Sequence, residues 1–173
     1  MGSERRIVVS NSGPLIHLAR IGRLNRLREL FGTVIIPVDV KIEVVDRGKE
    51  EGAADAFLIE SEIRAGWIVI DEINTNNSIK EIAESAGIEI GETAAIMLAR
   101  RKNCTILLDD LAARRFAIGL GLEVAGSIGV LIRSAKIRRL SKSEALDSLG
   151  RLARVLWLGV DVYEDARKTI EGL

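Results

Sequence analysis

The 173 residues of this chain suit one domain, with room for a short appendage. Apolar residues make up 47% of the sequence and aromatic residues only 3%, so a full core is expected and must consist of Leu, Ile, Val and Ala. The formal net charge is zero, which excludes whole-molecule attraction to nucleic acid and leaves local basic patches as the source of any polyanion binding. The same composition argues against disorder.

The first half of the chain alternates short apolar runs with helical patterns. We expect strands at 7–9, 33–36 and 67–70. Asn11 or Ser12 is a candidate cap for a helix with Pro14 in its first turn, and a second short helix ends near Gly32. Further helices are expected through Val40–Val45, with Glu43 in the middle, and over 53–65. A polar loop is expected at 74–77.

The second half continues the alternation. Ser78 and Glu81 match a capping box, and so do Ser141 and Glu144. The expected elements are a helix from 78 to Gly87, a helix from Ile90 with Glu92 at its start, a strand at 105–108, a helix at 111–120, a strand at 123–125, and helices at 127–135, 142–156 and 161–170. Such alternation predicts a mostly parallel sheet covered on both faces. We expect 1–140 to form this domain and 141–173 to be a helical C-terminal extension packed on it.

Only one cysteine, Cys104, and one histidine, His17, are present. One cysteine is too few for an intramolecular disulfide, and one cysteine with one histidine is too few for a structural zinc site made of Cys and His. We expect Cys104 to act as a small core residue and His17 to have a packing or surface role. The opening residues lead into a run too short for a signal peptide, and no stretch approaches the roughly 18 apolar residues of a membrane span. We therefore expect a cytoplasmic protein with no membrane partner.

Acidic and amide side chains gather where a ligand of a parallel sheet is expected. Ligands bind beyond the carboxyl ends of the strands, and that rule selects residues that follow strands or open the next helix. The selected set is Asn11, Glu43, Glu92, Asp109 and Asp110. Clustered carboxylates repel unless a cation lies between them, and their oxygens suit Mg²⁺ or Mn²⁺. Each residue alone also has a structural interpretation, such as an N-cap for Asp110 or a favourable contact with the helix dipole for Glu92.

Four blocks of sequence in order resemble PIN domains, near the VapC-type toxins. They are 8–16 (VVSNSGPLI), 35–37 with Glu43-Val44, 91–96 (GETAAI) and 107–114 (LLDDLAAR). The resemblance covers about 7–140. It implies a three-layer α/β/α sandwich of PIN type and a Mg²⁺- or Mn²⁺-dependent ribonuclease, with metal-site residues at Asn11, Glu43, Glu92 and Asp110 and with Asp109 adjacent. Asn11 stands where the pattern of active nucleases has Asp.

The resulting hypothesis is an endoribonuclease, the toxin of a toxin–antitoxin pair. Its substrate would be RNA, and its expected partners are a small antitoxin protein and a second copy of the chain in a homodimer. Glu43, Glu92 and Asp110 would be catalytic, Ser12 would support them, and Arg114 and Arg115 would meet phosphates. One alternative is a catalytically weak or inactive PIN-like protein that binds RNA or a protein partner. Another is a phosphorylation receiver, which would place its acidic pair after its first strand.

Overall fold

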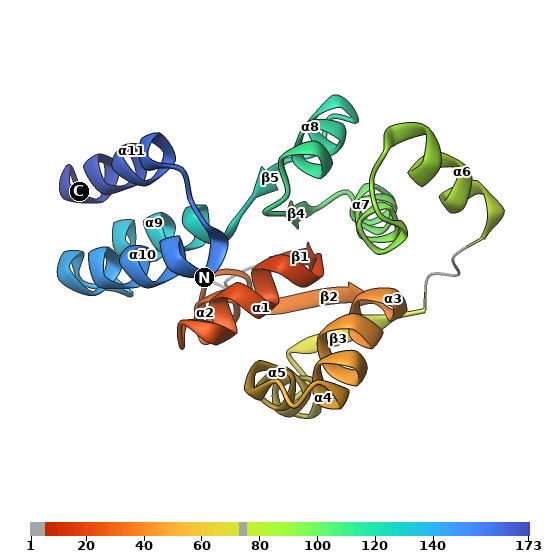
Figure 1. Ribbon diagram of the computed structural model, residues 1–173, viewed down its shortest axis with the longest axis horizontal. Coiled ribbons are helices and arrows are strands. Elements are labelled where there is room, and N and C mark those ends of the chain that lie inside the picture. The colour runs from red at the N-terminus through yellow and green to blue at the C-terminus, as the bar shows by residue number, and fades with distance from the viewer. Residues whose placement is uncertain (1–5, 73–75) are drawn as a thin grey trace.

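The computed structural model describes residues 6–72 and 76–173 (Figure 1). In this part of the chain five strands form one parallel sheet in the order β3-β2-β1-β4-β5. The strands are β1 (Ile7–Ser10), β2 (Thr33–Pro37), β3 (Ile68–Asp71), β4 (Thr105–Leu107) and β5 (Val124–Ala125). The predicted strands are confirmed, each to within one residue at either end. Sequence pattern succeeds here because each strand is a short apolar, mostly β-branched run, as expected for a sheet covered on both faces.

Helices connect and cover the strands. They are α1 (Ser12–Arg20), α2 (Asn25–Phe31), α3 (Val38–Lys41), the π-helical segment η1 (Ile42–Arg47), α4 (Gly48–Glu50), α5 (Ala54–Arg64), α6 (Asn77–Ala86), α7 (Ile90–Lys102), α8 (Leu111–Gly119), α9 (Ser127–Lys136), α10 (Lys142–Leu156) and α11 (Val160–Glu171). The predicted helices are confirmed. Two details were not foreseen: the helix around Glu43 widens into the π-helical η1, and η1 continues directly into the short α4, which ends before α5 begins.

One predicted helix start was wrong. The capping box expected at Ser78 and Glu81 does not form, because Asn76 is the N-cap of α6 and its side chain accepts a hydrogen bond from the backbone N–H of Ile79. Asparagine caps helices as well as serine does, and Asn76 precedes Ser78 in the chain. Part of the predicted polar loop at 74–77 lies outside the described residues. The second capping box, Ser141 with Glu144, is confirmed at the start of α10.

The sheet is covered on both faces, as predicted. Alternate residues of each strand point to opposite sides, so Val8 belongs to one hydrophobic cluster and Val9 to the other. On one face α7 and α8 pack against the sheet, and α6 packs on α7. On the other face the larger cluster joins the sheet to α1, α2, α5 and α9 (Figure 1). The result is a three-layer α/β/α sandwich, the arrangement that the PIN resemblance implies.

The C-terminal helices share the larger core. Leu149 and Leu152 of α10 and Ile170 of α11 are fully buried in the same cluster as the sheet residue Val8. Helix α10 packs against α1, α9 and α11. Residues 141–173 therefore form a helical layer that rests on the same core as the sheet. None of the helices within 6–72 and 76–173 is long and apolar enough to cross a membrane.

Candidate active site

The site lies at the topological switch point of the sheet, between β1 and β4, where the strand order reverses. β1 is central, with β2 on one side and β4 on the other, so the segments that leave β1 and β4 diverge at their carboxyl ends. The backbone N–H of Asn11 donates to Leu107 O at 3.1 Å and keeps the two strand ends together. Such a switch point is where ligands bind in open parallel sheets.

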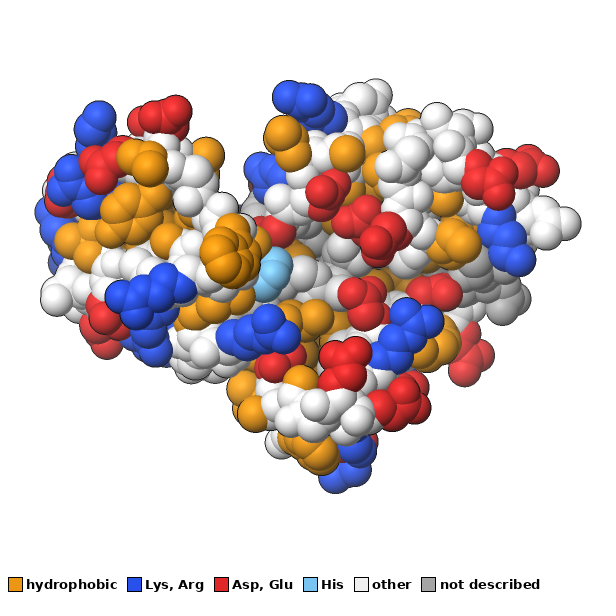
Figure 2. Space-filling model, viewed as in Figure 1, with side chains coloured by type: hydrophobic (Ala, Val, Ile, Leu, Met, Phe, Trp, Pro, Cys, Tyr) orange, Lys and Arg blue, Asp and Glu red, His pale blue; other side chains and the backbone are white. Residues whose placement is uncertain are grey.

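A cavity of about 300 Å³ opens at this edge. It is lined by Asn11, Ser12, Gly13, His17, Glu43, Glu89, Glu92, Asp109, Asp110 and Leu156. These residues come from the end of β1, helix α1, η1, the start of α7, the end of β4 and the end of α10. The predicted convergence of Asn11, Glu43, Glu92, Asp109 and Asp110 on one cleft is therefore confirmed, while their chemical roles stay predictions. Figure 2 shows acidic side chains grouped beside the single histidine on this face.

Two hydrogen bonds tie the first strand end to carboxylates that are far away in sequence. The Asn11 amide Nδ2 donates to Glu92 Oε1 at 3.3 Å, and the Ser12 hydroxyl donates to Glu43 Oε2 at 2.6 Å. Asn11 occupies the N-cap position of α1, but its side chain makes no capping hydrogen bond and faces Glu92 instead. Ser12, predicted to support the site, orients Glu43.

Glu92 sits in an acidic environment. Burial raises the pKa of its carboxyl, and the neighbouring Asp110, Glu89 and Glu43 raise it further, against the lowering effect of a hydrogen bond from the Glu89 backbone N–H at 3.4 Å. A cation beside Glu92 would remove the repulsion that raises this pKa.

Asp110 has a structural contact as well as a place in the cleft. It is the N-cap of α8, and its Oδ1 accepts a hydrogen bond from the Ala113 backbone N–H at 2.8 Å. The structural interpretation of Asp110 as a cap is confirmed. Its side chain is also exposed at the cleft, so capping and ligand binding are compatible.

Asp109 is the most firmly held of these carboxylates. Its Oδ1 accepts from the Ser127 backbone N–H at 2.7 Å, and its Oδ2 accepts from the Ser127 hydroxyl at 2.6 Å and lies 2.7 Å from His17 Nδ1. Burial raises its pKa, but the hydrogen bonds from His17 and Ser127 outweigh burial and hold the pKa of Asp109 below its usual range. Both oxygens are occupied by partners within the protein.

The close packing around Asp109 depends on Gly126. A Cβ atom at this position would lie 2.8 Å from Asp109 Oδ1 and 3.0 Å from the backbone oxygen of Leu108. The Arg114 guanidinium donates to the same Leu108 oxygen at 2.8 Å. Gly126 therefore lets the start of α9 approach the end of β4, and Arg114 fixes that strand end.

His17 lies in the wall of the cleft, against Asp109. The sequence favoured a packing or surface role for it, and its contact with a cleft carboxylate was not foreseen. Gly13 and His17 are four residues apart, on the face of α1 that meets Asp109. Ser127 was also missed, although the rule of strand ends selects it as the first residue of α9, the helix that follows β5.

The two arginines expected to bind RNA differ in setting. Arg114 is partly buried and engaged with Leu108, whereas Arg115 is exposed. Neither is among the residues that line the cleft. Contact of these arginines with RNA phosphates stays a prediction.

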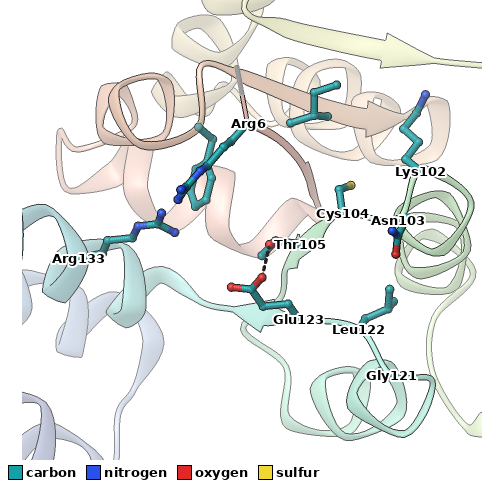
Figure 3. Close-up of a pocket in the computed structure, with 11 residues that line it drawn as sticks. Arg6, Lys102, Asn103, Cys104, Thr105, Gly121, Leu122, Glu123 and Arg133 are labelled. Atoms are coloured by element: carbon teal, nitrogen blue, oxygen red, sulfur yellow. Dashed lines mark hydrogen bonds between the residues drawn. The ribbon is translucent and has the colours of Figure 1, made fainter. Parts of the chain in front are cut away.

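A larger cavity of about 720 Å³ lies at the opposite edge of the sheet, where β1, β4 and β5 begin. Figure 3 shows Arg6 and Arg133 on one side of it and Lys102 on the other. Arg133 lies over the Phe31 ring, 5.3 Å from its centre, and Glu123 accepts a hydrogen bond from Thr105 at 3.0 Å. Cys104, half-buried against the smaller core cluster, also lines this cavity. The edge predicted to bind the ligand is nevertheless the one that carries the acidic cleft.

The carboxylates of the cleft fit a hard cation by their chemistry but do not form a ready-made ligand set. Within 6–72 and 76–173, no group of three or more His, Cys, Asp or Glu side chains stands in an arrangement that could hold a metal ion. Hydrogen bonds from Ser12, Asn11 and the Ala113 backbone hold the individual carboxylates in place. To bind one ion together, Glu43, Glu92 and Asp110 would have to shift from the positions that they have in this structure.

Comparison with known proteins gives one match. A family model described as a PIN domain matches residues 7–171, which includes α10 and α11 as well as the sheet. No curated protein and no solved structure matches. The match agrees with the four sequence blocks and with the parallel sheet, and it leaves the receiver alternative without support. This chain belongs to the PIN domain family.

Proposed function

We propose that this protein is a divalent-metal-dependent endoribonuclease that hydrolyses RNA phosphodiester bonds. Nuclease activity in general follows from the family, because PIN domains are typically nucleases that act on nucleic acid. The observation that carries the finer proposal is the convergence of Asn11, Glu43, Glu92 and Asp110, from four separate segments, on one cleft of about 300 Å³.

Glu43, Glu92, Asp110 and the amide oxygen of Asn11 are the residues that would hold Mg²⁺ or Mn²⁺, since hard oxygen ligands suit these ions. A bound divalent ion supplies positive charge for the phosphate and a lowered pKa for a water molecule. We propose that Asp109 does not bind the ion itself but positions the residues that do. Because both of its oxygens are engaged by Ser127 and His17, it fixes the strand end from which Asp110 projects.

The protein's own side chains prepare the cleft in three ways. Ser12 orients the Glu43 carboxylate, and Asn11 donates to Glu92 without adding a negative charge. The raised pKa of Glu92 favours its protonated form when no cation is near. We propose these contacts as the arrangement from which substrate and ion are bound.

The wider biological proposal is a cytoplasmic toxin that pairs with a small antitoxin and forms a homodimer. Its support is the resemblance of the sequence blocks to VapC-type proteins. The alternative is a catalytically weak PIN-like protein that binds RNA or a protein partner. The observation that favours the alternative is Asn11, whose neutral amide takes the position of a carboxylate in the active-nuclease pattern and is already paired with Glu92.

The test is cleavage of a fluorophore-labelled single-stranded RNA with Mn²⁺, with Mg²⁺ and with EDTA. We expect cleavage with either ion, none with EDTA, and at least a tenfold loss in Glu43→Gln, which keeps an acceptor for Ser12 but removes the charge. Glu84→Gln is the matched control, because Glu84 is an exposed glutamate of α6 that does not line the cleft. Cleavage that persists in EDTA, or that is unaffected by Glu43→Gln, would refute the proposal.

A further inference from the structure

Trp157 is an exposed aromatic residue that the core does not account for. Its side chain is 91% exposed, the highest fraction among the exposed large hydrophobic side chains of the described residues. The other tryptophan, Trp67, is only 5% exposed and donates its indole N–H to Glu62. Trp157 thus contributes almost no burial to the fold, although burial is the main way in which aromatic side chains stabilise a protein.

The backbone at Trp157 also disfavours a large side chain. It closes α10 in the left-handed conformation, with φ 52° and ψ 47°, and the next N–H, of Leu158, donates to Ala153 O at 3.1 Å. Glycine is the residue that adopts this helix-ending conformation without steric penalty, as Gly87 does at the end of α6. Neither packing nor local conformation therefore explains a tryptophan here.

The position of Trp157 relates it to the acidic cleft. The preceding residue, Leu156, lines the cleft together with Glu43, Glu92 and Asp110. Helix α10 packs on α1, which carries Ser12 and His17, so the end of α10 is fixed beside the site. Figure 2 shows exposed hydrophobic surface next to the histidine on the side of α10 and α11, facing the acidic group across it.

We infer that Trp157 is a stacking platform for a base of single-stranded RNA that lies across the cleft. This inference rests on the proposed function and adds a substrate-binding residue to it. The net charge is zero, the cleft is acidic, and neither Arg114 nor Arg115 lines it. At the cleft itself, RNA binding therefore needs contacts that do not depend on charge, in addition to any basic patch elsewhere. Stacking of a base on an aromatic ring is such a contact, and it tolerates any base because every base presents a flat face.

The test uses the two-tryptophan protein as it stands. Tryptophan fluorescence is recorded while a short oligouridine RNA, or an abasic oligomer of the same length, is titrated into the protein. The proteins compared are wild type, Trp157→Gly and Trp157→Phe, each in EDTA and again with Ca²⁺. Trp67 is buried and serves as the internal reference. Trp157→Gly removes the ring at a position whose backbone conformation suits glycine, and Trp157→Phe keeps an aromatic face.

We expect RNA to quench wild-type emission and the abasic oligomer to leave it unchanged. Trp157→Gly should bind RNA about 5- to 150-fold more weakly, the range given by the loss of one stacked base. Trp157→Phe should stay within a few-fold of wild type. In cleavage assays with Mn²⁺, Trp157→Gly should raise KM with little change in kcat, because Trp157 is not among the residues that line the acidic cleft. Its melting temperature should be equal to or above that of wild type.

Several results would overturn the inference. They are an absence of quenching, equal RNA affinity of Trp157→Gly and wild type, or a change from dimer to monomer in Trp157→Gly with unchanged RNA affinity, which would make Trp157 a contact between two copies. The outcome for the nuclease is separate. RNA binding that depends on Trp157, without metal-dependent cleavage, would support the stacking role and refute the proposed nuclease activity. Metal-dependent cleavage with the same KM in wild type and Trp157→Gly would support the nuclease activity and refute the stacking role.

Discussion

Replacing Asn11 with Asp tests the electrostatics of the cleft. Asn11 Nδ2 donates to Glu92 Oε1 at 3.3 Å, so the substitution sets two carboxylates at about that separation. Two unit charges this close repel by about 5 kcal/mol at an effective dielectric constant near 20. The protein avoids this repulsion by protonating one of the pair, which at pH 7 costs about 4 kcal/mol for a carboxyl of ordinary pKa and at pH 5 about 1 kcal/mol.

The pKa of Glu92 is already raised in the wild-type protein, so protonation costs less than for an ordinary carboxyl. We therefore expect Asn11→Asp to lower the free energy of unfolding by about 2–4 kcal/mol at pH 7 and by about 1 kcal/mol at pH 5 in EDTA. With saturating Mn²⁺ the deficit at pH 7 should shrink, because a cation between the two carboxylates removes their repulsion and binds only the folded state.

The assay is urea unfolding of wild type, Asn11→Asp and Asn11→Ala at both pH values, with EDTA and with Mn²⁺. Asn11→Ala is the control: it removes the hydrogen bond without adding charge and should cost about 1 kcal/mol at either pH. The double variant Asn11→Asp with Glu92→Gln should recover most of the loss. A loss in Asn11→Asp that is below about 0.5 kcal/mol at pH 7, or equal at pH 5 and pH 7, would refute this view of the pair.

Three further predictions concern neighbouring residues. Asp109→Ala removes the three hydrogen bonds that Asp109 accepts and should destabilise the fold by about 2–4 kcal/mol in urea unfolding. Because the folded-state pKa of Asp109 is lowered, the stabilisation by Asp109 is present at neutral pH and should be lost as pH falls through that pKa. Glu92→Gln should raise the melting temperature at pH 7 in EDTA, and the gain should vanish in acid, since a raised folded-state pKa makes Glu92 stabilising only while it is protonated. Gly126→Ala should lower stability by about 1–3 kcal/mol in thermal unfolding, because its Cβ would meet the Leu108 oxygen at 3.0 Å; an unchanged melting temperature would show that the loop yields freely.

The sheet and the acidic cleft were readable from the sequence for one physical reason. Short apolar runs identify buried parallel strands, and a parallel sheet brings the residues after its strands to one edge. Asn11 follows β1 directly, and Asp109 and Asp110 come between β4 and α8, so their convergence needed no knowledge of side-chain packing. Glu43 and Glu92 lie in helices, and their place in the cleft rested on the PIN resemblance as well as on this rule.

The contacts within the cleft were not readable in the same way. Sequence spacing does not say that Asn11 would turn from capping α1 toward Glu92, or that η1 would take the form of a π-helix around Glu43. These choices depend on the side chains that three other segments bring to the site. The contact of His17 with Asp109 was not foreseen, because a lone histidine on a helix has no recognisable partner until the end of β4 is placed against it.

The C-terminal helices show a related limit. The apolar stripe of α10 predicts an amphipathic helix, and Leu149 and Leu152 are buried as that pattern requires. The stripe does not specify where the helix docks, so the presence of Leu156 in the cleft wall could not be foreseen. The segment that we expected to be an extension thus contributes a wall of the candidate active site.

The central claim is that the cleft binds a divalent cation through its carboxylates, and calorimetric titration of Mn²⁺ into wild type and Asp110→Asn tests it most directly. Asparagine caps helices as well as aspartate, so this variant should keep the contact with the Ala113 N–H and melt at the wild-type temperature in EDTA. We predict saturable Mn²⁺ binding in wild type, weakened at least tenfold in Asp110→Asn. Wild type that binds no Mn²⁺, or equal affinity in the two proteins, would contradict the account.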